Sequence, residues 1–98
     1  MFMDTNYEKH TGIAEILKAL GHPIRFCIVV NLLKNGETNV TKMQKCLQIP
    51  QSTLSQHLQT LKIAKLIEGT RNGLEINYHI SDDNVKDLIK TIIALKAE

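Results

Sequence analysis

Apolar residues recur every three or four positions through the first two thirds of this 98-residue chain. This is the spacing of helices that bury one face. Gly21 follows the first such stretch, as a glycine after a helix does, and Pro23 and Pro50 each precede a stretch. The pattern predicts four consecutive helices between residues 12 and 64, after a frayed start at residues 1–11.

The pattern changes after residue 66 from helical spacing to alternation, which is typical of strands. Asn72-Gly73 separates two such runs, residues 66–71 and 74–80, and this dipeptide predicts a tight hairpin. A broad apolar stripe over residues 82–96 then predicts a last helix. Alternate residues of the second strand should share one face, namely Leu74, Ile76, Tyr78 and Ile80.

Polar side chains suited to capping precede two of the predicted helices. Thr41 and Gln44 have the spacing of a capping box, which would open the third helix. Ser81 is expected to cap the last helix, with Asp82 and Asp83 near the positive end of its dipole.

The predicted order is therefore four helices, two strands and a helix. We expect a mainly α fold with a β-hairpin wing, the winged helix-turn-helix architecture, as a single domain over residues 1–98. The helix-turn-helix would occupy residues 40–64, the wing residues 66–80, and the C-terminal helix residues 82–96.

The fourth predicted helix has the composition of a helix that reads DNA. Leu54, Leu58 and Leu61 share one face, and the remaining side chains are small, polar and almost all uncharged. Gln56 points away from the leucines and could bond an adenine through two hydrogen bonds. A solvated polar face without a partner is the alternative reading. The candidate DNA-binding residues are Gln51, Ser52, Thr53, Ser55, Gln56 and Gln59 on this helix, and Arg71 and Asn72 on the wing. His57 lies beside the leucines and is expected to be structural.

The charge distribution supports a polyanionic partner weakly. The net charge is only +2, but residues 40–72 contain a single acid, Glu68, against Lys42, Lys45, Lys62, Lys65 and Arg71. Such a surplus can contact phosphates, although it also fits a solvated surface. Hydrophobic residues at 43% exclude a disordered chain, and 4% aromatics without Trp argue against a surface that stacks single-stranded bases.

Three stretches resemble the ArsR-type bacterial transcriptional repressors. They are LKALGHPIR at residues 17–25, PQSTLSQHL at residues 50–58 and GLEINYHI at residues 73–80. The middle stretch is similar to the family's recognition-helix signature. The residues of the middle and wing stretches resemble those of the PagR-like branch, which lacks metal motifs. The likeness runs from about residue 13 to residue 95.

The resemblance implies a homodimer that binds double-stranded DNA at a palindromic operator, most simply as a repressor. The first and last helices of the family pair across the two-fold axis. Their apolar stripes also exceed what one small core needs, although both helices could instead close the core of a monomer. The expected dimer interface is Ile13, Ile16, Leu17, Leu20, Leu88, Ile89, Ile92 and Ile93.

The resemblance does not extend to the family's metal ligands. The family's Cys-Val-Cys motif falls on Asn39-Val40-Thr41, and its last-helix ligands fall on Asp82, Asn84, Leu95 and Glu98. The missing thiolates and imidazoles are the ligands that soft and borderline metal ions need. We therefore predict no metal site, no cofactor and no response to metals.

Two cysteines, Cys27 and Cys46, leave a thiol-responsive repressor open as an alternative. Each stands on an apolar stripe, where cysteine usually acts as a small hydrophobe. A winged-helix module that binds proteins instead of DNA is a further alternative. We predict no enzymatic activity, because no phosphate loop, metal cluster or nucleophile–base pair is readable. The absence of a signal peptide or an apolar run that could span a bilayer predicts a cytoplasmic protein without membrane contact.

Overall fold

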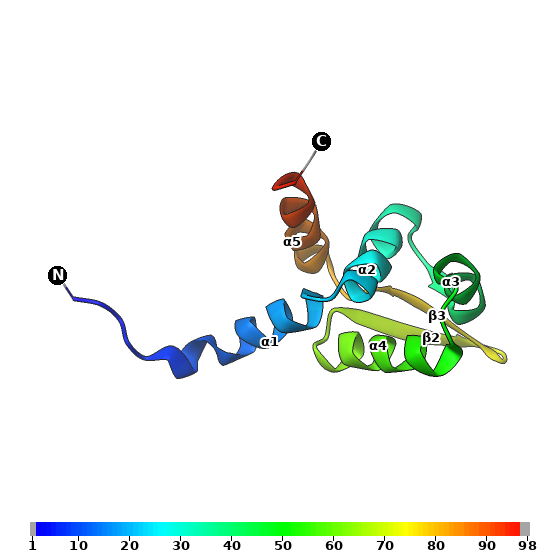
Figure 1. Ribbon diagram of the computed structural model, residues 1–98, viewed down its shortest axis with the longest axis horizontal. Helices are drawn as coiled ribbons and strands as arrows, with labels where there is room; N and C mark the ends of the chain where they lie inside the picture. The colour runs from blue at the N-terminus through cyan, green and yellow to red at the C-terminus, as the bar shows by residue number, and fades with distance from the viewer. Residues whose placement is uncertain (1, 97–98) are drawn as a thin grey trace.

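A computed structural model describes residues 2–96, and the predicted order of helices and strands is confirmed (Figure 1). Each helix boundary lies within one or two residues of the expectation, and glycine or proline marks four of the ends, at Gly21, Pro23, Gly36 and Pro50. The predicted elements are α1 (Thr11–Leu20), α2 (Pro23–Asn35), α3 (Val40–Leu47), α4 (Gln51–Ile63), β2 (Ile67–Asn72), β3 (Glu75–Ile80) and α5 (Asp83–Ala94).

Two short elements were not predicted. A 3-10 helix, η1 (Tyr7–His10), leads directly into α1, where we expected an irregular start. A two-residue strand, β1 (Thr38–Asn39), pairs antiparallel with β3 and completes a sheet of order β1-β3-β2. A two-residue strand is too short to show a period in the sequence. It forms because it pairs with β3, which is far along the chain.

The expected cap of α3 was wrong by two positions. Asn39, not Thr41, is the N-cap, and its side-chain oxygen accepts a hydrogen bond from the Lys42 backbone N–H at 2.9 Å. The backbone of Asn39 is extended because it also belongs to β1, and an N-cap requires this non-helical conformation. Gln48 ends α3 with a left-handed backbone (φ 54°), which turns the chain toward α4.

The cap of α5 also differs from the expectation. Asp82 is the N-cap and accepts from the Val85 backbone N–H at 2.9 Å. Ser81 instead donates its hydroxyl to the backbone carbonyl of Lys65 at 2.8 Å. Ser81 thus joins the end of β3 to the turn that follows α4, while the carboxylate of Asp82 stabilises the start of α5.

The wing turns one residue later than expected. Asn72 pairs with Glu75, so the two loop residues are Gly73 and Leu74, and Gly73 has a positive φ of 67° that favours glycine. Leu74 is fully exposed in this loop, which corrects the prediction that it belongs to the second strand. The other three alternate residues of β3 are buried or half-buried, namely Ile76, Tyr78 and Ile80.

The core lies between α4, α2 and the sheet. Leu54, Leu58 and Leu61 of α4 are buried, as their spacing predicted. Leu20 of α1 and Ile89 of α5 are also buried within the single chain, at 6% and 0% exposure. Ile89 has no exposed surface and Leu20 almost none, so neither can add much contact area between subunits. These two residues therefore leave the predicted dimer interface and join the core.

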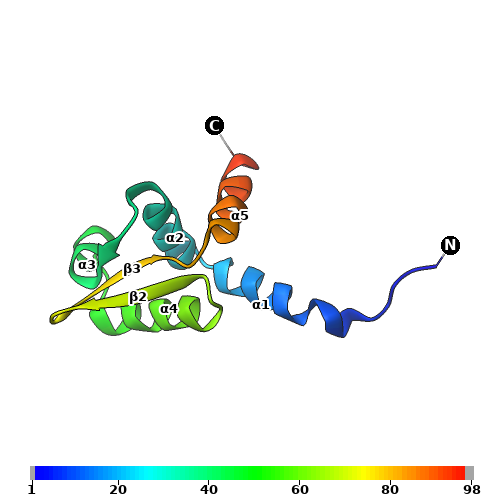
Figure 2. The ribbon, with the colours of Figure 1, turned by 180° about the vertical axis from the view of Figure 1, so that it is seen from behind.

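The first helix extends from the body of the molecule. Figures 1 and 2 show α1 and the preceding residues as an arm that points away from the wing. The arm makes the chain elongated, with extents of 56 × 31 × 24 Å. Ile13 and Leu17 on α1 are 62% and 52% exposed, although both are apolar. This arm thus presents an apolar surface that its own chain leaves uncovered.

Candidate nucleic-acid interface

The outward face of α4 is polar and open to solvent. Burial of the three leucines against the core directs the opposite side chains outward. Among the candidates, Thr53 is half-buried at the side of the helix, and the others on α4 are exposed, namely Gln51, Ser52, Ser55, Gln56 and Gln59. The exposed set consists of amides and hydroxyls, which are the groups that read base edges.

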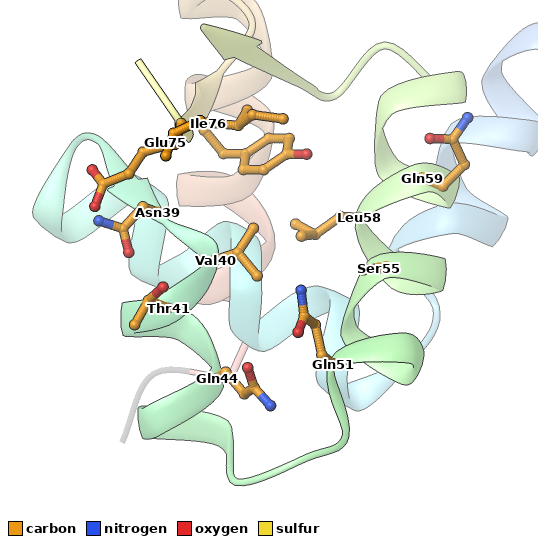
Figure 3. Close-up of a pocket in the computed structure, with 12 residues that line it drawn as sticks. Asn39, Val40, Thr41, Gln44, Gln51, Ser55, Leu58, Gln59, Glu75 and Ile76 are labelled. Carbon is orange, nitrogen blue, oxygen red and sulfur yellow. The ribbon is translucent and has the colours of Figure 1, made fainter. Parts of the chain in front are cut away.

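A groove of about 420 Å³ runs between α3, α4 and the wing (Figure 3). Gln51, Ser55 and Gln59 of α4 form part of its wall. Gln44 from α3 and Glu75 from β3 line it as well, and neither was among the predicted site residues. In Figure 3 the amides of Gln44 and Gln51 reach into the gap between the two helices. Both helices of the helix-turn-helix and the wing therefore contribute residues to the lining of this groove.

The wing places two of the candidates near its tip. Arg71 and Asn72 are exposed at the end of β2, opposite Ile76 and Glu75 on β3. The two strands pack closely at Gly69, where a Cβ atom would come within 2.9 Å of Cγ2 of Ile76. A hairpin with a cation near its end can follow a DNA groove beside α4.

The cationic side chains of this region are all free to reach a polyanion. Each is exposed, and none takes part in a salt bridge among the described residues. Exposed ammonium and guanidinium groups bind phosphates at little desolvation cost. They are Lys42 and Lys45 on α3, Lys62 on α4, Lys65 in the turn after α4, and Arg71 on β2.

His57 lies on the side of α4 that faces the body, as expected for a structural histidine. Its ring centroid is 4.5 Å from that of His22, and Nη1 of Arg25 lies 3.4 Å from its Nδ1. Burial lowers the pKa of His57 below its ordinary value of 6.5, and the neighbouring His22 and Arg25 lower it further. The fold therefore favours the neutral imidazole, whose Nδ1 can accept from the guanidinium.

This depressed pKa predicts that stability falls in mild acid. The unfolded chain takes up the proton near pH 6.5, before the folded chain does, so the stabilisation present above that pH is lost as the pH falls toward the folded-state pKa. Urea unfolding between about pH 7.5 and pH 5.5 should show a larger loss for the wild type than for His57→Asn. Equal losses in the two proteins would contradict the prediction.

The structure does not assemble a metal site from the residues it describes. Within residues 2–96 no three His, Cys, Asp or Glu side chains gather closely enough to hold an ion. Glu98, one of the positions aligned with the family's ligands, lies outside the described residues.

No single helix in the described part of the chain is long and apolar enough to cross a membrane. The segments Tyr7–Leu20 and Pro23–Asn35 reach that length only together, and they meet at 91°.

Within the described residues, five α-helices with a β-hairpin wing, in which α3 and α4 form a helix-turn-helix with an exposed polar face on α4, define a winged helix-turn-helix protein. Residues 23–68 match the family described as bacterial regulatory protein, arsR family. The transcriptional repressor PagR of Bacillus anthracis is 43% identical over 79 residues, which cover 81% of this chain and 79% of PagR. The chain belongs to the arsR family of bacterial regulatory proteins, as the resemblance indicated. It is a regulatory protein and not an enzyme.

Solved structures agree with this assignment. The crystal structure of PagR matches with a TM-score of 0.76 and 40% identity, covering 89% of this chain and 99% of that one. The homodimeric winged helix-turn-helix DNA-binding domain of Mb0332 from Mycobacterium bovis has a solution structure that matches with a TM-score of 0.84. Its identity is 27%, over 98% of this chain and 88% of that one. An HTH-type transcriptional regulator of Methanocaldococcus jannaschii, MJ1325, is 41% identical over 87% of this chain and 96% of its own length.

Proposed function

We propose that this protein is a homodimeric repressor of transcription that binds a palindromic operator in double-stranded DNA without control by a metal ion. The observation that carries the proposal is the exposed amide and hydroxyl face of α4, bordered by the groove to the wing and by five exposed cations. The relative PagR is a transcriptional repressor, and the neighbour Mb0332 contains a homodimeric DNA-binding domain.

Gln56 is the proposed base reader. It is exposed on α4, and its amide can donate to and accept from one adenine. Ser52 and Ser55 stand near the start of α4, where backbone N–H groups and hydroxyls favour phosphate contacts. Arg71 would follow the minor groove, and the exposed lysines would contact phosphates on either side.

The exposed apolar surface of α1 and the half-buried stripe of α5 support the dimer. Ile13 and Ile16 of α1 line one hollow of about 510 Å³ with Ile63 of α4 and Val85 of α5. Ile63 is 71% exposed and was not among the predicted interface residues. A second copy would cover this surface, because monomers rarely leave large apolar patches exposed. The proposed interface residues are Ile13, Ile16, Leu17, Leu88, Ile92 and Ile93, with Ile63 added.

Replacing Gln56 with alanine should weaken operator binding by about 1–3 kcal/mol and relax specificity at one base pair. The amide would be lost from the base edge, whereas the core of α4 would stay intact because Gln56 is exposed. Gel shifts with the protein's own promoter at two salt concentrations provide the measurement. Wild-type affinity should fall with salt, as phosphate contacts require.

Asn84→Ala is the matched control for this test, because it removes an exposed amide from α5 instead of α4. Equal weakening by both variants would contradict the role of Gln56. Salt-independent binding to protein partners, with no operator shift, would favour the protein-interaction module instead. The outward face of α4 carries no acid, which disfavours that alternative.

Thiol-dependent regulation is a second candidate function, favoured by one observation. Cys27 of α2 and Cys46 of α3 line the same hollow of about 200 Å³. Both are free thiols, Cys27 half-buried and Cys46 exposed. A disulfide requires Cα atoms within roughly 7 Å of each other, and forming one would fix α3 against α2.

If this candidate is right, diamide will accept the two thiol hydrogens, join Cys27 to Cys46 and weaken operator binding. Dithiothreitol should restore the affinity, and Cys46→Ser should abolish the response. Mass spectrometry of peptides will identify the bond. Unchanged operator affinity after complete oxidation would reject thiol control and leave the DNA-binding proposal intact.

A further inference from the structure

The guanidinium of Arg25 connects three helices at one point. Arg25 lies in the first turn of α2, and its Nε donates to the Ala19 backbone carbonyl at 2.6 Å. Its Nη2 donates to the Lys18 carbonyl at 3.3 Å, and Nη1 lies 3.4 Å from Nδ1 of His57 on α4. One side chain therefore contacts the end of α1 and the side of α4 from a base on α2.

These contacts can fix the angle between α1 and α4. The carbonyls of Ala19 and Lys18 lie in the last turn of α1, where acceptors lack an i+4 partner within the helix. The Lys18 carbonyl also accepts from the backbone N–H of Gly21 at 3.2 Å. The guanidinium is planar and presents its donors in fixed directions, so satisfying two carbonyls leaves little freedom for the third contact. Arg25 is also half-buried, which strengthens these hydrogen bonds relative to solvent-exposed ones.

His22 is a second contact of the His57 ring. The Nδ1 of His22 accepts from the backbone N–H of Ile24 at 3.1 Å, and this bond caps α2. That bond fixes the ring of His22, and the ring of His57 lies against it at an angle of 45°. His57 thus contacts both the guanidinium of Arg25 and the capping imidazole of His22.

The two helices joined here have different proposed tasks. Leu17 on α1 belongs to the proposed dimer interface, and Gln56, the neighbour of His57 on α4, is the proposed base reader. In a symmetric dimer, the direction of α4 relative to α1 determines the distance and rotation between the two recognition helices.

We propose that Arg25 and His57 are positioning residues that determine the spacing of operator half-sites. This inference rests on the proposed function of a dimer on a palindromic site. Moving one half-site by a base pair displaces it about 3.4 Å and rotates it about 35° around the duplex. A rigid junction between α1 and α4 discriminates against such a change, whereas a loosened junction accepts it.

The test uses a duplex selected from a random library by the wild-type protein, then rebuilt with one or two base pairs added to or removed from its centre. The wild type should lose roughly tenfold or more in affinity for each altered spacing. Arg25→Met and His57→Leu keep the volume of each side chain and should reduce that loss to less than about threefold.

Conservative and control variants separate positioning from general stability. His57→Asn retains an acceptor near the position of Nδ1 and should restore the wild-type spacing preference. Lys34→Met removes one positive charge from the exposed end of α2 and should leave the preference unchanged. Dimer mass and circular dichroism of each variant confirm that the fold is present, and His57→Leu carries the test if Arg25→Met does not fold.

Two different failures are distinguishable. Wild-type protein that selects no duplex would overturn the proposed function, and this inference with it. Wild-type protein that selects a palindrome, combined with variants that keep its strict spacing, would overturn the positioning role of Arg25 and His57 alone.

Discussion

Replacing Leu17 with glutamate is expected to convert the dimer into a monomer and to lower operator affinity by roughly 10²–10⁴-fold. Leu17 is 52% exposed on α1, so the new carboxylate is solvated in a monomer. In a dimer it would be buried against apolar side chains, which is costly for an unpaired charge. A monomer also loses the second recognition helix, and with it the gain from binding two half-sites at once.

Sedimentation measures the first effect, because the chain has a mass of 11.1 kDa and a dimer has twice that. Gel shifts with the palindromic duplex measure the second. Thr11→Glu is the control, since it adds a carboxylate at an exposed position of α1 away from the apolar stripe. A Leu17→Glu protein that remains dimeric, with unchanged operator affinity, would show that α1 does not form the interface.

Replacing Leu61 with alanine is expected to lower the free energy of unfolding by about 2–5 kcal/mol. Leu61 is completely buried, and it anchors the C-terminal half of α4 to the core. The loss combines reduced apolar burial with an unfilled cavity, because the surrounding side chains relax only partly. Since small domains have a total stability of about 5–15 kcal/mol, the variant should be marginal.

Urea unfolding at a fixed protein concentration checks this value, because the stability of a dimer depends on concentration. Lys62→Ala changes the adjacent, exposed residue and should alter stability by no more than about 0.5 kcal/mol. Loss of less than 1 kcal/mol for Leu61→Ala would mean that α4 is held by its polar contacts instead of its leucines.

The recognition helix illustrates why much of this fold is readable from sequence. Leu54, Leu58 and Leu61 repeat at helical spacing, and Pro50 marks the start of the helix within one residue. Both signals link residues no more than four positions apart, so they can be read from the sequence alone. The outward direction of Gln56 follows from the same spacing, and the structure places it there.

The helix caps illustrate where such reading fails. Thr41 and Ser81 have the right chemistry for capping, but Asn39 and Asp82 occupy the cap positions. The conformation of Asn39 depends on pairing with Asn77 in β3, a residue distant in sequence. The local sequence contains several residues that could cap a helix, and the tertiary structure determines which of them does so.

By itself, the sequence determined the succession of helices and strands, the leucine-anchored polar face of α4 and membership in a family of regulators. These features depend on periodicity and on motifs within short segments, and in such segments the local conformational preferences agree with the final fold. Only the tertiary structure decided that Leu20 and Ile89 belong to the core, that β1 completes the sheet and that Arg25 meets His57. Burial and contacts between distant segments depend on how helices pack in space, and two residues 32 positions apart have no shared local pattern to reveal that they touch.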